Sequence, residues 1–220
     1  KLKNTKNMAK YEISTLPKFF KDQTHYLVDP DSGYEALQDF FLRWTIHCAE
    51  DKYRFSNPKL HIYSKRILFA LIYGQNQKDD FVLTEDQGDF KVINIKTLRQ
   101  LSDIDLIILI EFEKNNQIEK YVLNIENKWY SNLGKDQFTK YKEFIENHDF
   151  SKYIKDFKSP KIKNLFITCD DERRYYDAEK NLCRANNYFF LVISDLQKVA
   201  NISIDGPTGN ALFDEFWFNS

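Results

Sequence analysis

Hydrophobic and polar residues follow two spacings along the chain, and each spacing predicts a different kind of element. A helical spacing begins at Tyr34, where apolar residues recur three or four positions apart. The expected buried stripe consists of Leu37, Phe40, Phe41, Trp44 and Cys48. Further helices are expected at 134–148, 176–186 and 194–201, and the aromatic tail at 210–220 also fits a helix. The first thirty or so residues show neither spacing and are expected to be irregular.

Short runs rich in Ile, Leu, Val and Phe predict strands. Such runs lie at 66–74, 103–114, 117–128, 163–169 and 188–193, and one or two shorter extended pieces are expected between 80 and 100. Because helices and strands are interleaved, the pattern predicts an α/β or mixed α+β domain with one central sheet flanked by helices. We expect residues 1–32 to be an N-terminal extension and 33–220 to form a single domain.

The two strongest strand candidates are separated by Asn115 and Asn116, which suit a two-residue hairpin turn because Asn tolerates positive φ. A centred turn fixes which residues face each other across the hairpin. The expected facing pairs are Glu111–Lys120, Asp105–Glu126 and Asp103–Lys128. One face of the hairpin is then purely apolar and is expected to be core, while the other face carries the charged residues.

This register places the carboxylates of Asp105 and Glu126 opposite each other, and like charges in that position destabilise a sheet. A divalent cation between them removes the repulsion, since Mg²⁺ is typically held by one or two carboxylates, waters and phosphate. The alternative is an ordinary pair of strand charges that face solvent or form surface ion pairs. The acid-x-Lys pattern recurs at 50–52, 89–91 and 156–158, but only 126–128 combines an apolar strand, a facing acid and a following helix.

These residues resemble the PD-(D/E)xK nuclease superfamily, and in particular its standalone branch with an I-E-N-K motif. Ser102–Asp103–Ile104–Asp105 matches the region of the first acid, and Ile125–Glu126–Asn127–Lys128 matches the acid-x-Lys motif. Gln137 and Tyr141 match the QxxxY motif of the following helix. An early Glu35 followed by Leu42-Arg43-Trp44 matches the first helix of this branch. The chain departs from the pattern where no Pro precedes Asp105.

The resemblance spans residues 33–195 and implies a restriction-endonuclease-like fold with an αβββαβ core. It implies a Mg²⁺- or Mn²⁺-dependent nuclease that acts on nucleic acid, most commonly DNA. The catalytic residues that it implies are Asp105, Glu126, Lys128, Gln137 and Tyr141. The metal ligands that it implies are Asp105, Glu126, Asn127 through its backbone carbonyl, and Glu35 as an outer ligand. The Pro30–Asp31 pair precedes the first helix and does not match the motif. A nuclease-fold binding module without turnover is the alternative function.

The composition limits which partners and which cellular compartment we expect for this chain. A formal net charge of −1 argues against a charge-dominated nucleic-acid binder, although a local basic groove is compatible with it. Three widely spaced cysteines without a CxxC motif predict reduced thiols and a cytoplasmic protein, and the four histidines show no zinc-ligand spacing. The longest apolar run, 104–110, is too short to cross a membrane. The tail at 213–218 fits either the core or a homodimer contact.

Overall fold

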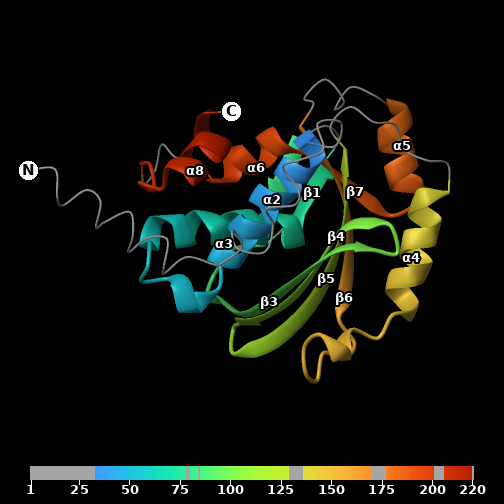
Figure 1. Ribbon diagram of the computed structural model, residues 1–220, viewed down its shortest axis with the longest axis horizontal. Coiled ribbons are helices and arrows are strands. Elements are labelled where there is room, and N and C mark those ends of the chain that lie inside the picture. Colours follow the sequence, from blue (N-terminus) through green and yellow to red (C-terminus); the bar gives the residue numbers. More distant parts are fainter. Residues whose placement is uncertain are drawn as a thin grey trace, which may run out of the picture.

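The computed structural model describes residues 33–77, 80–83, 85–128, 136–169, 177–200 and 206–219. The expected extension at 1–32, which includes Pro30–Asp31, lies outside the described residues. A five-stranded mixed sheet occupies the centre of the molecule (Figure 1). The strands lie in the order β3 (Phe90–Leu101), β4 (Ile104–Lys114), β5 (Gln117–Lys128), β6 (Lys161–Thr168) and β7 (Tyr188–Val192).

The first three strands of this sheet are antiparallel neighbours, whereas β5, β6 and β7 run parallel. Parallel neighbours need a crossover, and helices provide it on both occasions. The connection from β5 to β6 contains α4 (Gln137–Asn147), and the connection from β6 to β7 contains α5 (Asp177–Ala185). This order confirms the expected mixed α/β architecture, with a first helical layer, three strands, a helix and a further strand.

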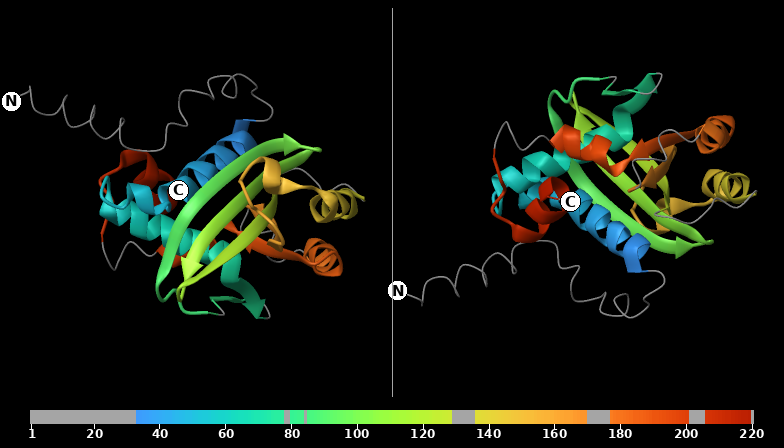
Figure 2. Two further views of the ribbon diagram at one scale, coloured as in Figure 1. Left: turned by 90° about the horizontal axis from the view of Figure 1, so that it is seen from below. Right: turned by 90° about the horizontal axis from the view of Figure 1, so that it is seen from above.

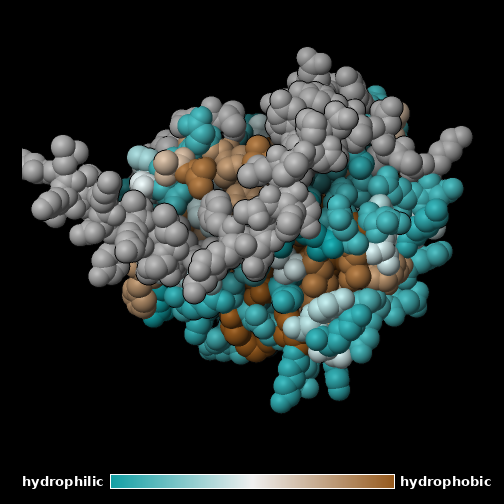
Figure 3. All heavy atoms as spheres, viewed as in Figure 1, coloured by the Kyte–Doolittle hydropathy of each residue, from teal (hydrophilic) through white to brown (hydrophobic). Residues whose placement is uncertain are grey.

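Helices cover both faces of the sheet (Figures 1 and 2). One face packs against α2, α3, α6 and the C-terminal segment, and the other face packs against α4 and α5. The remaining bounds are α2 (Gly33–Cys48), α3 (Pro58–Tyr73), α6 (Ile193–Ala200), α8 (Ala211–Asp214), the π-helical turn η5 (Glu215–Asn219) and the 3-10 turns η2 (Asp51–Tyr53) and η3 (Phe150–Lys152). Hydrophilic side chains predominate over the α4 and α5 side in the space-filling view (Figure 3).

The hairpin of β4 and β5 has the expected register. Leu106 pairs with Ile125 and Glu111 pairs with Lys120, and both turn residues, Asn115 and Asn116, have positive φ. The strand nevertheless begins one residue later than expected. Ser102 and Asp103 form a second tight turn between β3 and β4 with φ of 54° and 64°, so the expected pairing of Asp103 with Lys128 is wrong.

Both faces of β4 and β5 are buried. The expected core face packs against α2 and α3, while Ile107, Leu109 and Val122 on the opposite face pack against Tyr141 and Ile145 of α4. Alternation along these strands is therefore weak, and nearly every residue of β4 from Ile104 to Ile110 is buried. A central strand covered on both faces has this near-continuous apolar pattern.

The strand expected at 66–74 is wrong, because residues 66–73 form the C-terminal half of α3. The Asn57 side chain accepts a hydrogen bond from the Leu60 backbone N–H, and Pro58 occupies the first helical position, which together start the helix. Every residue from Ile67 to Tyr73 is buried. A helix that is apolar all round shows no helical periodicity, so a short apolar run is easily mistaken for a strand.

The short hairpin of β1 (Gly74–Gln77) and β2 (Asp80–Leu83) follows α3 directly. Gly74 is required at this junction, because a Cβ there would lie 2.4 Å from the Ala70 carbonyl oxygen and 2.6 Å from the Phe81 ring. The hairpin contacts β7 at the edge of the main sheet. The hairpin therefore lies beside that edge of the sheet.

The C-terminal tail belongs to the core. Phe213 and Trp217 are fully buried, and the Trp217 indole N–H donates to the Thr45 hydroxyl of α2 over 2.8 Å. All three cysteines are unbridged, as expected. In the described residues, no helix combines the length and the apolar character needed to span a membrane.

Candidate active site

The first acid of the site lies at the start of β4. The Asp105 carboxylate accepts a hydrogen bond from the backbone N–H of Asn127 over 3.0 Å. This contact forms just beyond Leu106↔Ile125, the last regular pair of the hairpin. Because the strands have stopped exchanging backbone hydrogen bonds there, the Asp105 side chain takes over the role of a backbone acceptor. The side chain is 30% exposed, so the same carboxylate also reaches solvent.

The second acid, Glu126, has a fully buried side chain on β5. The ammonium of Lys128 lies 2.7 Å from one Glu126 carboxylate oxygen and 4.0 Å from an Asp105 carboxylate oxygen. One cationic group therefore contacts both acids. Burying a carboxylate is costly unless it is paired and hydrogen-bonded, and this pairing supplies the compensation.

Helix α4 supports Glu126 from the side. Gln137 and Tyr141 lie one turn apart and project from the same helix face. The Gln137 amide donates to Glu126 over 2.7 Å and lies 2.8 Å from the Tyr141 hydroxyl. The Tyr141 hydroxyl in turn donates to the backbone carbonyl of Asp103 over 2.6 Å. Burial raises the pKa of Tyr141, and the Glu126 charge adds to this effect, so the hydroxyl stays protonated and able to donate.

Asp39 of α2 is a site residue that sequence reasoning missed. Its carboxylate accepts a hydrogen bond from the Asn127 side-chain amide over 3.0 Å and lies 3.4 Å from the Arg99 guanidinium. Burial raises the pKa of Asp39 to about 7, and the Asp105 charge contributes to the same rise, whereas Asn127, Arg99 and Arg43 oppose it. Asn127 is therefore held from both sides, by Asp105 at its backbone and by Asp39 at its side chain.

The expected helical stripe explains why Asp39 was missed. The stripe assumed that Leu37 faces the core, but Leu37 is 40% exposed, whereas Asp39 and Gln38 are buried. The available signal in the sequence was an acid four residues after Glu35 and directly before two phenylalanines. Glu35 itself lies in the first turn of α2, and its side chain is outside the described part of the structure.

The structure thus brings six of the expected residues into one cluster at one end of the hairpin: Asp105, Glu126, Asn127, Lys128, Gln137 and Tyr141. Within the described residues, no three His, Cys, Asp or Glu side chains converge in a way that holds a metal ion. The carboxylates of Asp105 and Glu126 share one cation, the Lys128 ammonium. Two carboxylates arranged around a cation are a donor set that suits Mg²⁺ or Mn²⁺.

A comparison with protein families identifies the superfamily of the chain. The model of the PD-(D/E)XK nuclease superfamily matches residues 24–213. No curated protein and no solved structure matched the chain. The family match covers the whole central sheet and the helices from α2 to α6. The chain therefore belongs to the PD-(D/E)XK nuclease superfamily, whose members generally hydrolyse phosphodiester bonds.

Proposed function

We propose that this protein is a Mg²⁺- or Mn²⁺-dependent nuclease that hydrolyses phosphodiester bonds in DNA. The observation that carries the proposal is the position of the Lys128 ammonium between the carboxylates of Glu126 and Asp105. Two acids at neighbouring positions of a hairpin repel each other, and a cation between them offsets this cost. The arrangement is accounted for if the acids serve a cation in the reaction.

In this proposal Asp105 and Glu126 hold the metal ion, together with the backbone carbonyl of Asn127 and with Glu35. A bound divalent cation lowers the pKa of a water ligand and polarises the phosphate. Gln137 fixes the orientation of the Glu126 carboxylate, and Tyr141 anchors Gln137 and the turn before β4. Outer partners of this kind orient metal ligands in many sites.

Lys128 has a second task in the proposal. Its ammonium sits on a flexible stem and neutralises the acids when no metal ion is bound. When a divalent cation occupies that position, the ammonium is available to orient the attacking water and to offset charge on the scissile phosphate. The three unbridged cysteines support a reducing compartment, and we propose the cytoplasm.

The experiment is a cleavage assay on linear, circular and single-stranded DNA and on RNA, with Mg²⁺ or Mn²⁺ and with EDTA. The test variant is Glu126→Gln, which keeps the shape of the side chain and removes its charge. The matched control is Glu113→Gln, at the opposite end of the same hairpin. The proposal predicts DNA cleavage by the wild type and the control, and none by Glu126→Gln or with EDTA.

Equal cleavage by the wild type and Glu126→Gln would assign the activity to another site or to a contaminant. Cleavage of RNA alone would overturn the choice of DNA while keeping the nuclease. If the protein binds DNA in the presence of the metal ion but cleaves none of the substrates, the result would favour the binding module.

A further inference from the structure

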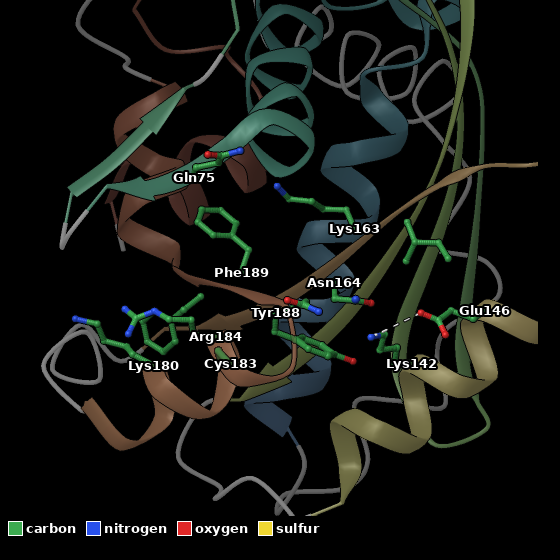
Figure 4. Close-up of a pocket in the computed structure, with 13 residues that line it drawn as sticks. Gln75, Lys142, Glu146, Lys163, Asn164, Lys180, Cys183, Arg184, Tyr188 and Phe189 are labelled. Carbon is green, nitrogen blue, oxygen red and sulfur yellow. Dashed lines mark ion pairs between the residues drawn. The ribbon is translucent and has the colours of Figure 1, made fainter.

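A cavity lies at the edge of the sheet, on the β7 side of the molecule. The pairing of β6 with β7 begins at Asn164 and Tyr188, whereas β6 itself begins at Lys161. The first residues of β6 therefore extend past the start of β7. The corner is walled by α4, α5 and the β1–β2 hairpin and encloses a cavity of about 810 Å³ (Figure 4).

The charge of this cavity is strongly positive. Its cationic side chains are Lys142, Lys163, Lys180 and Arg184. The single carboxylate in the lining, Glu146, lies 3.8 Å from the Lys142 ammonium, and Figure 4 shows this pair on α4. The lining therefore carries an excess of cations over acids, although the whole chain has a net charge of −1.

Lys163 is a half-buried cation in the lining of this cavity. Its ammonium donates to the Gly74 carbonyl oxygen over 3.2 Å and lies 5.1 Å from the centre of the Phe189 ring. Burial lowers the pKa of Lys163, because the ammonium is partly withdrawn from water. Among the residues that the structure describes, no carboxylate forms an ion pair with it. A half-buried cation in a polar cavity is typical of a site that receives an anion.

Arg184 lies on the α5 side of the same cavity. Its guanidinium is held by the Asn181 side chain over 3.0 Å, and within the described residues no carboxylate pairs with it either. A guanidinium presents several N–H donors in a fixed plane and suits the oxygens of a phosphate group. Asn164 and Tyr188 also line the cavity (Figure 4). The size of the cavity suits a ligand up to that of a nucleotide.

The cavity shares a helix with the candidate active site. Lys142 and Glu146 follow Gln137 by five and nine residues on α4, which places them roughly 8–14 Å further along the helix axis. The Phe138 ring, next to Gln137, stacks on the Tyr188 ring of the cavity lining with centroids 3.9 Å apart. A polynucleotide held at the active site is long enough to reach this corner.

We infer that this cavity is a phosphate-binding site, separate from the site where the scissile phosphate is proposed to bind. The phosphate has two sources with the same chemistry, a backbone phosphate of a bound strand or a mononucleotide. The inference concerns binding and does not depend on the nuclease activity, so it is testable in EDTA, where no metal-dependent cleavage occurs.

The test is a binding titration of the full chain in EDTA with two probes, dAMP and a 12-nucleotide single-stranded DNA. The variants are Lys163→Gln and Arg184→Gln, and the matched control is Lys91→Gln, an exposed lysine on β3 at the opposite edge of the sheet. We expect both cavity variants to weaken binding of at least one probe about tenfold, with a smaller salt dependence, and the control to bind as the wild type does.

The probes separate the two sources. Loss of dAMP and DNA binding together would assign the cavity to a mononucleotide or a strand end, and loss of DNA binding alone would assign it to a backbone phosphate. Unchanged binding of both probes by both cavity variants, or no binding of either probe by the wild type, would overturn the inference. Thermal melting identifies misfolding of Lys163→Gln, in which case the exposed Arg184→Gln variant decides the test.

Discussion

The Lys128 ammonium lies 2.7 Å from the buried carboxylate of Glu126, so a lysine and an acid two residues apart on β5 form a closed ion pair. Side chains two apart on a strand share a face, which brings the pair together. In the absence of a metal ion, Lys128 is the counterion of Glu126. A divalent cation at this position must compete with the ammonium. The Lys128 side chain should therefore affect both the stability of the metal-free protein and its affinity for metal ions.

Lys128→Met is expected to destabilise the metal-free protein. The change leaves Glu126 as a buried charge without its cation, which typically costs about 3–5 kcal/mol of unfolding free energy. Mn²⁺ should then raise the melting temperature of Lys128→Met more than that of the wild type, because the metal ion has no ammonium to displace. Thermal melts with EDTA and with Mn²⁺ measure both effects. A smaller Mn²⁺ effect in the variant would show that Lys128 helps the metal ion to bind.

Tyr141→Phe is expected to remove the hydrogen bonds that hold Gln137 and the turn before β4 in place. The hydroxyl donates to the Asp103 carbonyl and lies beside the Gln137 amide, and both groups lose this partner in the variant. We expect a loss of about 1–3 kcal/mol in unfolding free energy and a lower kcat for cleavage. Urea unfolding and cleavage kinetics measure these effects. Tyr153→Phe, directly after the turn η3, is the matched control and should leave kcat unchanged.

Asp39 is expected to position Asn127. Asp39→Ala removes the acceptor of the Asn127 amide, and outer partners of this kind typically contribute about 10–100-fold to activity or metal affinity. Asp39→Asn retains an oxygen that can accept the same hydrogen bond, so it should keep more activity than Asp39→Ala. Cleavage rates at saturating Mn²⁺ compare the two. Equal losses in both variants would assign the effect to the Arg99 contact instead.

Acid is expected to weaken the fold through His61, a buried residue of α3. Burial lowers the pKa of His61, while the Cys48 carbonyl, which faces the ring over 3.0 Å, opposes this effect. Below about pH 6.5 the unfolded chain binds the proton more readily than the folded protein does. The unfolding free energy should therefore fall as the pH is lowered through this range.

His61→Gln tests this origin. Urea unfolding of the metal-free protein at pH 7.5 and 5.5 should show a smaller loss of stability in the variant than in the wild type. Part of the loss should remain, since burial also lowers the pKa of His47 and His148. The same loss in both proteins would show that His61 does not contribute.

The sequence predicted the parts of the fold that depend on local patterns. The Asn115–Asn116 turn predicted the hairpin register, and the register placed Asp105 beside the acid-x-Lys motif. Local pattern failed at α3, because a helix buried on all sides has no polar face to reveal its period. It also failed at Asp103, since a second tight turn without glycine gave no recognisable signal.

The role of Asp39 could not be predicted from local sequence patterns, for a different reason. Its contact with Asn127 joins residues 88 positions apart, and only the packing of α2 against the sheet brings them together. A buried acid on an amphipathic helix indicates that a partner exists but does not identify it. The cavity beside β7 is similar, because its cations come from separate elements that the sequence does not relate.

The most direct measurement of the central claim is a calorimetric titration of Mn²⁺ into the wild type, Asp105→Asn, Glu126→Gln and the control Glu113→Gln. The account predicts binding to the wild type and to the control, and at least tenfold weaker binding to both site variants. Wild-type affinity in Glu126→Gln and Asp105→Asn would contradict it, because the two acids that share the Lys128 ammonium would then not be the metal ligands.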